Sequence, residues 1–127
     1  MEVTSITVPS DVTELRMNFG GMNSLTSVTL PEGLITIGYY TFYGCSSLNT
    51  ITVPSTVTAI GQNAFANIGT ITLVCLATTP PTLENTDAFT STSGNIYVPD
   101  TSVDAYKEAT NWSTYASRIK GLSELSQ

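Results

Sequence analysis

The sequence predicts an α/β repeat solenoid that is mostly β, with about four to five short coils, stacked parallel strands and a C-terminal closing helix. The main observation behind this prediction is an internal repeat. Residues 24–45 and 47–68 can be laid over each other without a gap, at the single offset that separates Leu25 from Leu48. Eight positions then match, namely Leu25/Leu48, Val28/Ile51, Leu30/Val53, Pro31/Pro54, Leu34/Val57, Ile37/Ile60, Gly38/Gly61 and Phe42/Phe65. The second observation is that a helical spacing of apolar residues replaces the repeat after Pro99.

The apolar residues of each repeat are spaced to line one core. Val28 and Leu30 share one face of a strand because side chains alternate along a strand, and Pro31, which lacks an N–H, ends that strand. Gly38 is expected to take a turn conformation that a side chain would resist, and Phe42 to fill the coil. A single coil cannot bury its own hydrophobic face, so the coils must stack. A period of this length with spaced aliphatic residues is typical of leucine-rich repeats, which makes the predicted fold a leucine-rich-repeat solenoid.

The first coil is less regular than the two that follow it. Its residues up to Leu15 match the second coil at an offset that is one position shorter than the regular repeat; Leu15, for example, matches Ile37. Phe19, in contrast, matches Phe42 at the full offset. One residue is therefore missing between Leu15 and Phe19, and the position of Gly38 is either taken by Arg16 or deleted. Such degraded repeats are typical of the ends of a stack.

The fourth coil and the strand after it rest on weaker matches. Aligning Ile71 with Ile51 leaves this coil three positions short of the regular repeat, which implies a junction shortened at residues 67–69. Residues 95–99 are predicted to form a fifth strand, ended by Pro99 as the first three strands are ended by proline.

The segment after Pro99 has helical periodicity. Val103, Tyr106 and Ala109 lie on one face, and Thr101 or Ser102 is expected to cap the N-terminus of the helix. We therefore expect a single domain over residues 1–127, with repeat coils over 1–99 and a closing helical segment over 100–122.

The repeat, LxxIxLPxxLxxIGxxxFxxC followed by SSL, resembles the BspA-like subgroup of leucine-rich repeats found in bacterial surface proteins. The junction at residues 44–48 matches that family closely, and residues 97–119 are similar to its C-terminal closing segment. The position where most leucine-rich repeats carry a ladder of buried asparagines holds none here, so binding sites of asparagine-type relatives are not transferred. The resemblance implies an extracellular or cell-surface location. Residues 1–5 lack the features of a signal peptide, so we expect either a fragment or a mature form.

Composition and charge narrow the range of functions. The net charge of −6, with four Lys and Arg in total, argues against nucleic acid and anionic membranes as partners. No apolar run reaches the length of about 18 residues that a membrane-spanning helix needs. The absence of histidine removes the usual general base, and no phosphate-binding glycine motif occurs. The sequence therefore predicts no enzyme and no cofactor.

Metal and thiol chemistry are equally poorly supported. Glu84 and Asp87 either form a loose calcium site with loop carbonyls or are solvated loop acids, and we predict no metal site. Two cysteines without histidine do not suit zinc. Cys45 closes one coil and Cys75 is expected to follow a strand, and they are either two buried thiols or a disulfide.

The first candidate binding surface is a column of hydroxyl groups on the outward face of the strands. Aligning the strands places one threonine from each of the first four coils in this column, with a tyrosine in the fifth; the residues are Thr7, Thr29, Thr52, Thr72 and Tyr97. Neighbouring strands are about 4.8 Å apart, so the hydroxyls would form a regular ladder. The column is either a shallow face for a sugar or peptide, or simply a set of residues well suited to exposed strands.

The second candidate surface is Tyr39 and Tyr40, with Tyr43 nearby. The matching residues of the next coil, Gln62, Asn63 and Ala66, are polar or small, so core packing does not require tyrosine. Exposed tyrosines suit interfaces. The alternative is that they pack, partly buried, against the shortened turn of the first coil.

Taken together, these observations predict a non-enzymatic protein- or glycan-interaction module of a secreted or cell-surface bacterial protein. An adhesive role rests on the family resemblance, since fold does not fix function. The alternative is a purely structural closing or spacer segment of a longer repeat protein. We also expect edge-to-edge self-association through the N-terminal strand, which the sequence leaves uncovered.

Overall fold

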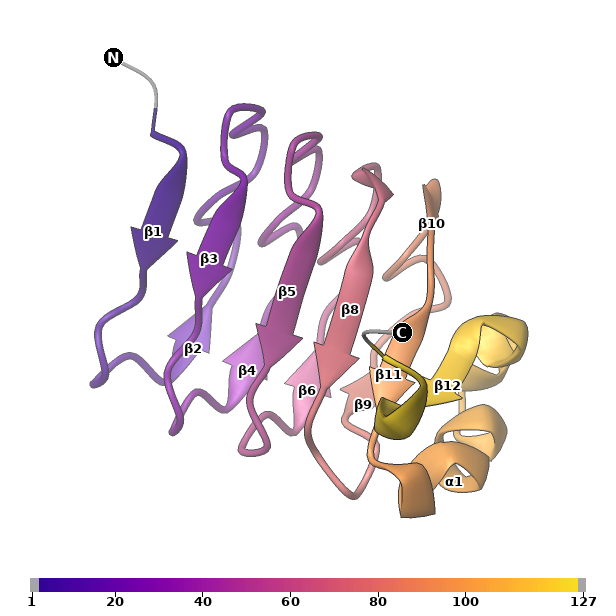
Figure 1. Cartoon of the computed structure of the whole chain (residues 1–127). Helices are drawn as coiled ribbons and strands as arrows, with labels where there is room; N and C mark the ends of the chain where they lie inside the picture. Colours follow the sequence, from indigo (N-terminus) through magenta and orange to yellow (C-terminus); the bar gives the residue numbers. More distant parts are fainter. Residues whose placement is uncertain (1–2, 126–127) are drawn as a thin grey trace.

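A computed structural model describes residues 3–125, in which short parallel strands are stacked side by side (Figure 1). Successive coils contribute a strand to a front layer and a shorter strand to a back layer. The front strands are β1 (Ser5–Thr7), β3 (Ser27–Thr29), β5 (Thr50–Val53), β8 (Thr72–Cys75), β11 (Ile96–Val98) and β12 (Ile119–Gly121). The back strands are β2 (Glu14–Leu15), β4 (Thr36–Ile37), β6 (Ala59–Ile60) and β9 (Thr82–Leu83), and a separate two-stranded sheet pairs β7 (Gly69–Thr70) with β10 (Thr92–Ser93). This confirms a mostly β repeat fold built from parallel strands.

The front layer corrects the predicted alignment of the fourth coil. Leu73, and not Ile71, pairs with Ile51, and Leu73 in turn pairs with Ile96. With Leu73 in this place the coil is one position short of the regular repeat, so the junction loses one residue and not three. Ile71 is buried just before the strand, at the position that Leu48 occupies before β5. Both candidates were apolar residues followed by a β-branched or polar neighbour, and periodicity could not separate them.

Glycine in the repeat has a different role from the predicted one. Neither Gly38 nor Gly61 has a positive φ. A Cβ added to Gly38 would lie 2.6 Å from the carbonyl oxygen of Leu15, and one added to Gly61 would lie 2.5 Å from the backbone nitrogen of Tyr39. The two glycines are therefore needed because successive coils approach closely, and not because the turn is left-handed.

The first coil shows how the missing residue is accommodated. Leu15 pairs with Ile37, which places Arg16 at the position of Gly38. The backbone nitrogen of Met17 donates to the carbonyl of Tyr39, as that of Tyr40 does to Gln62 in the next coil. Met17 is thus equivalent to Tyr40, and the residue that the first coil lacks is the equivalent of Tyr39.

Aromatic rings form a continuous stack through the core. Phe19, Phe42, Phe65 and Phe89 lie face to face, with ring centroids 5.4–5.5 Å apart, and Trp112 follows at 5.7 Å. Phe42 and Phe65 are fully buried, which confirms that they fill their coils. Trp112 follows Phe89 at the same offset that separates Phe65 from Phe42, so the repeat spacing continues into the C-terminal segment.

The C-terminal segment combines helical turns with a strand. It contains the α-helix α1 (Val103–Glu108) and the 3-10 helices Asp100–Ser102, Trp112–Arg118 and Leu122–Glu124. These turns lie at the end of the stack, and β12 adds to the front sheet beside β11 (Figure 1). The strand was not predicted, because Ile119 was assigned to a helical face. Ser102 precedes α1 as expected, but its hydroxyl donates to the carbonyl of Thr78 at 2.8 Å and does not cap the helix.

At the other end of the stack, β1 has one open edge. In the described part of the chain β1 pairs with β3 alone. Thr4 and Val8 are bonded to the second coil, and backbone groups alternate in direction along a strand. Ser5 and Thr7 therefore direct their N–H and C=O groups toward the open edge.

We expect the isolated 127-residue chain to form concentration-dependent dimers through this edge, because unpaired strand groups recruit other strands. Sedimentation over a range of concentrations measures this, and Thr7→Pro, which removes an outward N–H, should weaken the dimer. Ile6→Lys should act in the same direction through charge repulsion. A chain that stays monomeric at high concentration and protects the amides of Ser5 and Thr7 from exchange would contradict the prediction.

Candidate functional site

The outward face of the front strands carries exposed hydroxyl groups over the first three coils. Thr7 pairs with Thr29 across β1 and β3, and Thr52 occupies the same repeat position on β5. All three are exposed, as are Ser5, Ser27 and Thr50 in the neighbouring column. The two columns form a polar surface on which the sheet backbone is covered by small side chains.

On β8 the predicted column was wrong by two positions, whereas Tyr97 on β11 lies in it as predicted. Thr52 pairs with Val74, whereas Thr72 pairs with Thr50 and so belongs to the neighbouring column. Val74 then pairs with Tyr97, and Tyr97 with Lys120. Tyr97 is half-buried, and its hydroxyl accepts a hydrogen bond from the side-chain amide of Asn95 at 3.3 Å. The column of exposed hydroxyl groups therefore ends at β5: Val74 is buried, and Tyr97 and Lys120 follow toward the C-terminal segment.

A groove of about 310 Å³ lies on this face between β3 and β5. The two strands are neighbours (Figure 1), yet within residues 3–125 no ladder of hydrogen bonds joins them, and the front layer divides there into two sheets. The groove is lined by Ser27, Val28, Thr29, Leu30, Glu32, Thr50, Ile51, Thr52 and Pro54. Hydroxyl groups and one carboxylate thus surround a hollow with apolar patches, a combination that suits a ligand bearing both donors and apolar surface.

Some of the residues that line this groove were predicted from the sequence. Thr29 and Thr52 were predicted from their column, but Glu32, Leu30 and Pro54 were not considered as binding residues. They follow the strands by one to three positions, where the chain turns away from the front layer. These residues could have been predicted from the sequence because they lie at or next to the prolines that end the strands. The break between β3 and β5 could not, because the repeat pattern is regular there.

The tyrosines of the second coil form a ring cluster next to β4. The rings of Tyr39 and Tyr40 meet edge to face at 6.2 Å, and those of Tyr40 and Tyr43 lie 5.2 Å apart. Tyr39 is 43% exposed and Tyr43 is 38% exposed, whereas Tyr40 is half-buried. Tyr39 and Tyr43 therefore present aromatic surface to solvent, and Tyr40 supports them.

Both the backbone conformation of Tyr40 and a hydrogen bond to its hydroxyl restrict its ring. Its φ of 58° is left-handed, as are those of the equivalent residues Met17 at 54° and Asn63 at 57°. Asparagine tolerates this conformation, but for tyrosine it costs about 1–2 kcal/mol. The surroundings of the Asn63 amide assign its orientation: with the oxygen toward Tyr40 it accepts from the Tyr40 hydroxyl at 3.0 Å, and its nitrogen then donates to the backbone oxygen of Asp87 at 2.9 Å. This chain of hydrogen bonds links three successive coils and fixes the orientation of the Tyr40 ring.

Among the described residues, the acidic side chains do not form a metal site and the cysteines are not reactive thiols. Asp87 is engaged by Asn63, and residues 3–125 contain no group of three or more His, Cys, Asp or Glu that could hold a metal ion. Cys45 and Cys75 are both free and buried, which decides between the two alternatives that the sequence left open. Cys75 lies within β8 and not after it. Burial raises the pKa of both thiols, so they stay protonated at neutral pH and are poor nucleophiles.

Repeating parallel strands, a stacked aromatic core and glycines at the points of close coil contact place the chain in the leucine-rich-repeat class. A model of the BspA-type leucine-rich repeat region matches residues 1–114 with six copies of the repeat, and the chain belongs to this family. A search of curated proteins gave no match.

None of the described helices has both the length and the apolar character needed to cross a membrane. Repeat regions of this kind generally mediate protein interactions and are typically non-enzymatic, and BspA-type proteins are typically bacterial surface or secreted proteins.

Proposed function

We propose that this chain is a non-enzymatic interaction module of a secreted or cell-surface bacterial protein, that it has an adhesive role, and that its coils form a short solenoid presenting two binding surfaces to a protein or glycan ligand. The observation that carries the proposal is the groove between β3 and β5. It lies on an exposed polar face in a chain that has no histidine and no metal-binding cluster among its described residues.

The groove suits a neutral or weakly basic polar chain. Thr29, Thr50 and Thr52 each offer a hydroxyl that donates and accepts, and Glu32 offers an acceptor at one end. The Glu32 carboxylate also accepts from the hydroxyl of Ser55 at 3.2 Å, which holds it in place. A sugar hydroxyl or a peptide N–H can bind to these groups without bringing a buried negative charge beside Glu32.

The tyrosine cluster supports a protein partner in particular. Tyr39 and Tyr43 expose flat apolar surface with a polar tip, and tyrosine is enriched among the residues that dominate binding energy. Because Tyr40 is ordered by Asn63 before any ligand arrives, little rotamer entropy is lost on binding.

A binding screen against glycans and extracellular-matrix proteins, followed by variants, tests both surfaces. Thr29→Val with Thr52→Val removes groove hydroxyls at nearly constant shape, and Tyr39→Ser removes exposed aromatic surface. Each change should leave the melting temperature within about 2 °C, because surface substitutions usually change stability by less than about 0.5 kcal/mol. Each should weaken binding by about tenfold, equivalent to about 1.4 kcal/mol. Thr13→Val, at an exposed threonine that does not line the groove, is the matched control.

A loss of stability in Tyr39→Ser would show that this ring belongs to the core. Unchanged binding in both variants would remove these surfaces from the proposal.

The second candidate function is that of a structural closing or spacer segment of a longer repeat protein. The way in which the C-terminal segment covers the last coil favours it, since Trp112 and Tyr106 are fully buried against that end. A chain that binds nothing in the screen, but whose fusion stabilises a stack of related repeats, would support this alternative.

A further inference from the structure

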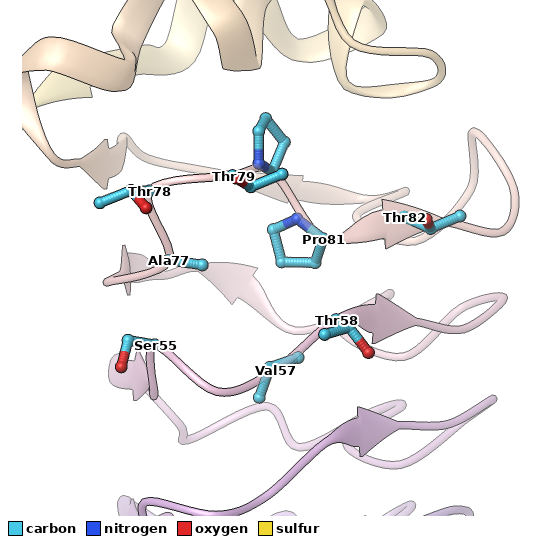
Figure 2. A pocket seen from close by; sticks show the side chains of 9 residues that line it. Ser55, Val57, Thr58, Ala77, Thr78, Thr79, Pro81 and Thr82 are labelled. Atoms are coloured by element: carbon cyan, nitrogen blue, oxygen red, sulfur yellow. The ribbon is translucent and has the colours of Figure 1, made fainter.

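A cleft of about 380 Å³ opens where the chain turns from the front layer to the back layer between the third and fourth coils. Figure 2 shows Ser55, Val57 and Thr58 on one side and Thr78, Thr79 and Pro81 on the other. This cleft shares no lining residue with the groove between β3 and β5, although Ser55 at its rim donates to Glu32 of that groove. It contains none of the three tyrosines of the second coil.

The two turns that form the cleft are joined at their ends and separate between them: the N–H of Leu76 donates to the carbonyl of Val53 at 3.0 Å, and that of Thr82 to the carbonyl of Thr58 at 2.9 Å. Six residues (76–81) join β8 to β9, whereas five (54–58) join β5 to β6. The shorter turn is bonded to the coil before it: Thr56 Oγ1 accepts from the N–H of Gly33 at 3.0 Å and donates to the carbonyl of Leu34 at 2.7 Å. On its other side lies the longer turn, whose extra residue lies between the two joined ends.

Three side chains of the C-terminal segment bind carbonyl groups of the longer turn. Tyr106 donates to Ala77 at 2.6 Å, Ser102 to Thr78 at 2.8 Å, and the indole N–H of Trp112 to Pro81 at 2.7 Å. All three donors are buried. The wall is therefore rigid, and the cleft exists before any ligand enters it, which lowers the entropy cost of binding.

The chemistry of the lining defines the class of ligand. Thr78, Thr79 and Thr82 are exposed at the opening, whereas the hydroxyls of Ser55 and Thr58 donate to Glu32 and Ile35 of the second coil. The apolar part consists of the half-buried Pro80 above the buried Val57, Ala77 and Pro81. None of the nine lining residues is charged, so an ionised ligand group would lose water without gaining a counter-charge. A sugar ring, with hydroxyls at its edge and C–H groups on its faces, fits both parts of this lining.

A second hollow lies on the other side of the same segment. It measures about 330 Å³ and is lined by Pro80, Pro81, Thr82, Leu83, Ala109, Thr110 and Trp112. It shares Pro80, Pro81 and Thr82 with the first cleft, and its lining is also uncharged. The proline segment is thus a ridge with an uncharged hollow on each side, and a ligand of more than one ring can contact both.

We infer that the cleft and the hollow beside it form a binding site for a neutral oligosaccharide of at least two sugar units, which straddles the Pro80–Pro81 ridge. The exposed threonine hydroxyls bind the ring substituents, and the half-buried Pro80 contacts the sugar C–H faces. Binding here is independent of the two surfaces in the proposed function.

The test is an amide-resolved NMR titration of the full chain with maltose, cellobiose, lactose and xylobiose, alongside sialyllactose as a charged comparison. At least one neutral disaccharide should give saturable shifts at Thr78, Thr79, Thr82 and Thr110, and the charged sugar should bind about tenfold more weakly or not at all. Thr79→Val should weaken binding by about three- to tenfold, which corresponds to the loss of one hydrogen bond. Thr79→Trp, at an exposed position, should fill the cleft and abolish the shifts.

Thr90→Val, at an exposed threonine outside both hollows, is the control and should bind normally. The Thr29→Val/Thr52→Val and Tyr39→Ser variants should keep the full response, which separates this site from the proposed function. No saturable shift with any neutral sugar up to its solubility limit would overturn the inference. So would shifts that survive Thr79→Trp, or a proline-rich peptide that binds this site when the sugars do not.

Discussion

Replacing Phe65 with alanine is expected to lower the free energy of unfolding by about 3–5 kcal/mol, the range observed when large core side chains are truncated. Phe65 is fully buried and stacks on Phe42 at 5.4 Å and on Phe89 at 5.5 Å. The truncation therefore removes ring contacts with two coils and leaves a cavity that the flanking strands cannot close. Denaturant melts monitored by circular dichroism measure the change.

Phe19→Ala is the matched comparison, because Phe19 is partly exposed and stacks on Phe42 alone among the described aromatic rings. It should cost clearly less than Phe65→Ala. A loss below about 1 kcal/mol for Phe65→Ala, well under the core range, would mean that the ring does not fill the centre of its coil.

Gly61→Ala is expected to be nearly as damaging, although it adds a single methyl group. The new Cβ would lie 2.5 Å from the backbone nitrogen of Tyr39 and 2.8 Å from the carbonyl carbon of Gly38. Backbone atoms cannot move aside as a flexible side chain can, so the two coils must separate. We expect a loss of about 3 kcal/mol, the upper part of the range for overpacking, measured in the same denaturant melts.

Gln62→Ala is the control for this substitution, since Gln62 is the exposed next residue in the chain. It should change stability by less than about 0.5 kcal/mol. If Gly61→Ala were equally mild, the coils would have to be separable at little cost, and close approach would not explain the glycine.

The structure was predicted best at positions where a single local requirement, burial at a fixed spacing, determines the residue type. The matched pairs from Leu25/Leu48 onward predicted the coils because burial demands an apolar residue at fixed spacing. The same spacing predicted that Phe42 and Phe65 fill their coils. The same reasoning failed at Ile71 and Leu73. Either residue satisfies burial, and the choice between them depends on which one faces Ile51 across the sheet.

Other features depend on contacts that periodicity does not encode. Ile119 fits a helical face, yet it follows Ile96 at the regular repeat offset and pairs with it; extending that offset past Pro99 would have revealed β12. The role of Gly38 was misread because a left-handed turn and a close backbone approach select the same residue. The groove between β3 and β5 arises where two regular coils separate, which the repeat pattern does not encode. The cleft beside Pro81 coincides with a turn that has one residue more than its counterpart in the third coil.

The two ends of the aromatic stack differ in how much of the terminal ring is exposed, and we therefore expect unfolding to start at one particular end. At one end Phe19 is partly exposed, whereas at the other Trp112 is completely covered. In a stack where each coil contacts its neighbours alone, opening spreads from the end whose last interface is weakest. Thermal fraying should therefore begin at the first coil and travel toward Trp112, so that amides of β1 exchange first and those of β8 and β11 last. A pulling force applied to the first coil would peel the coils one at a time, and each step would release one ring from the stack.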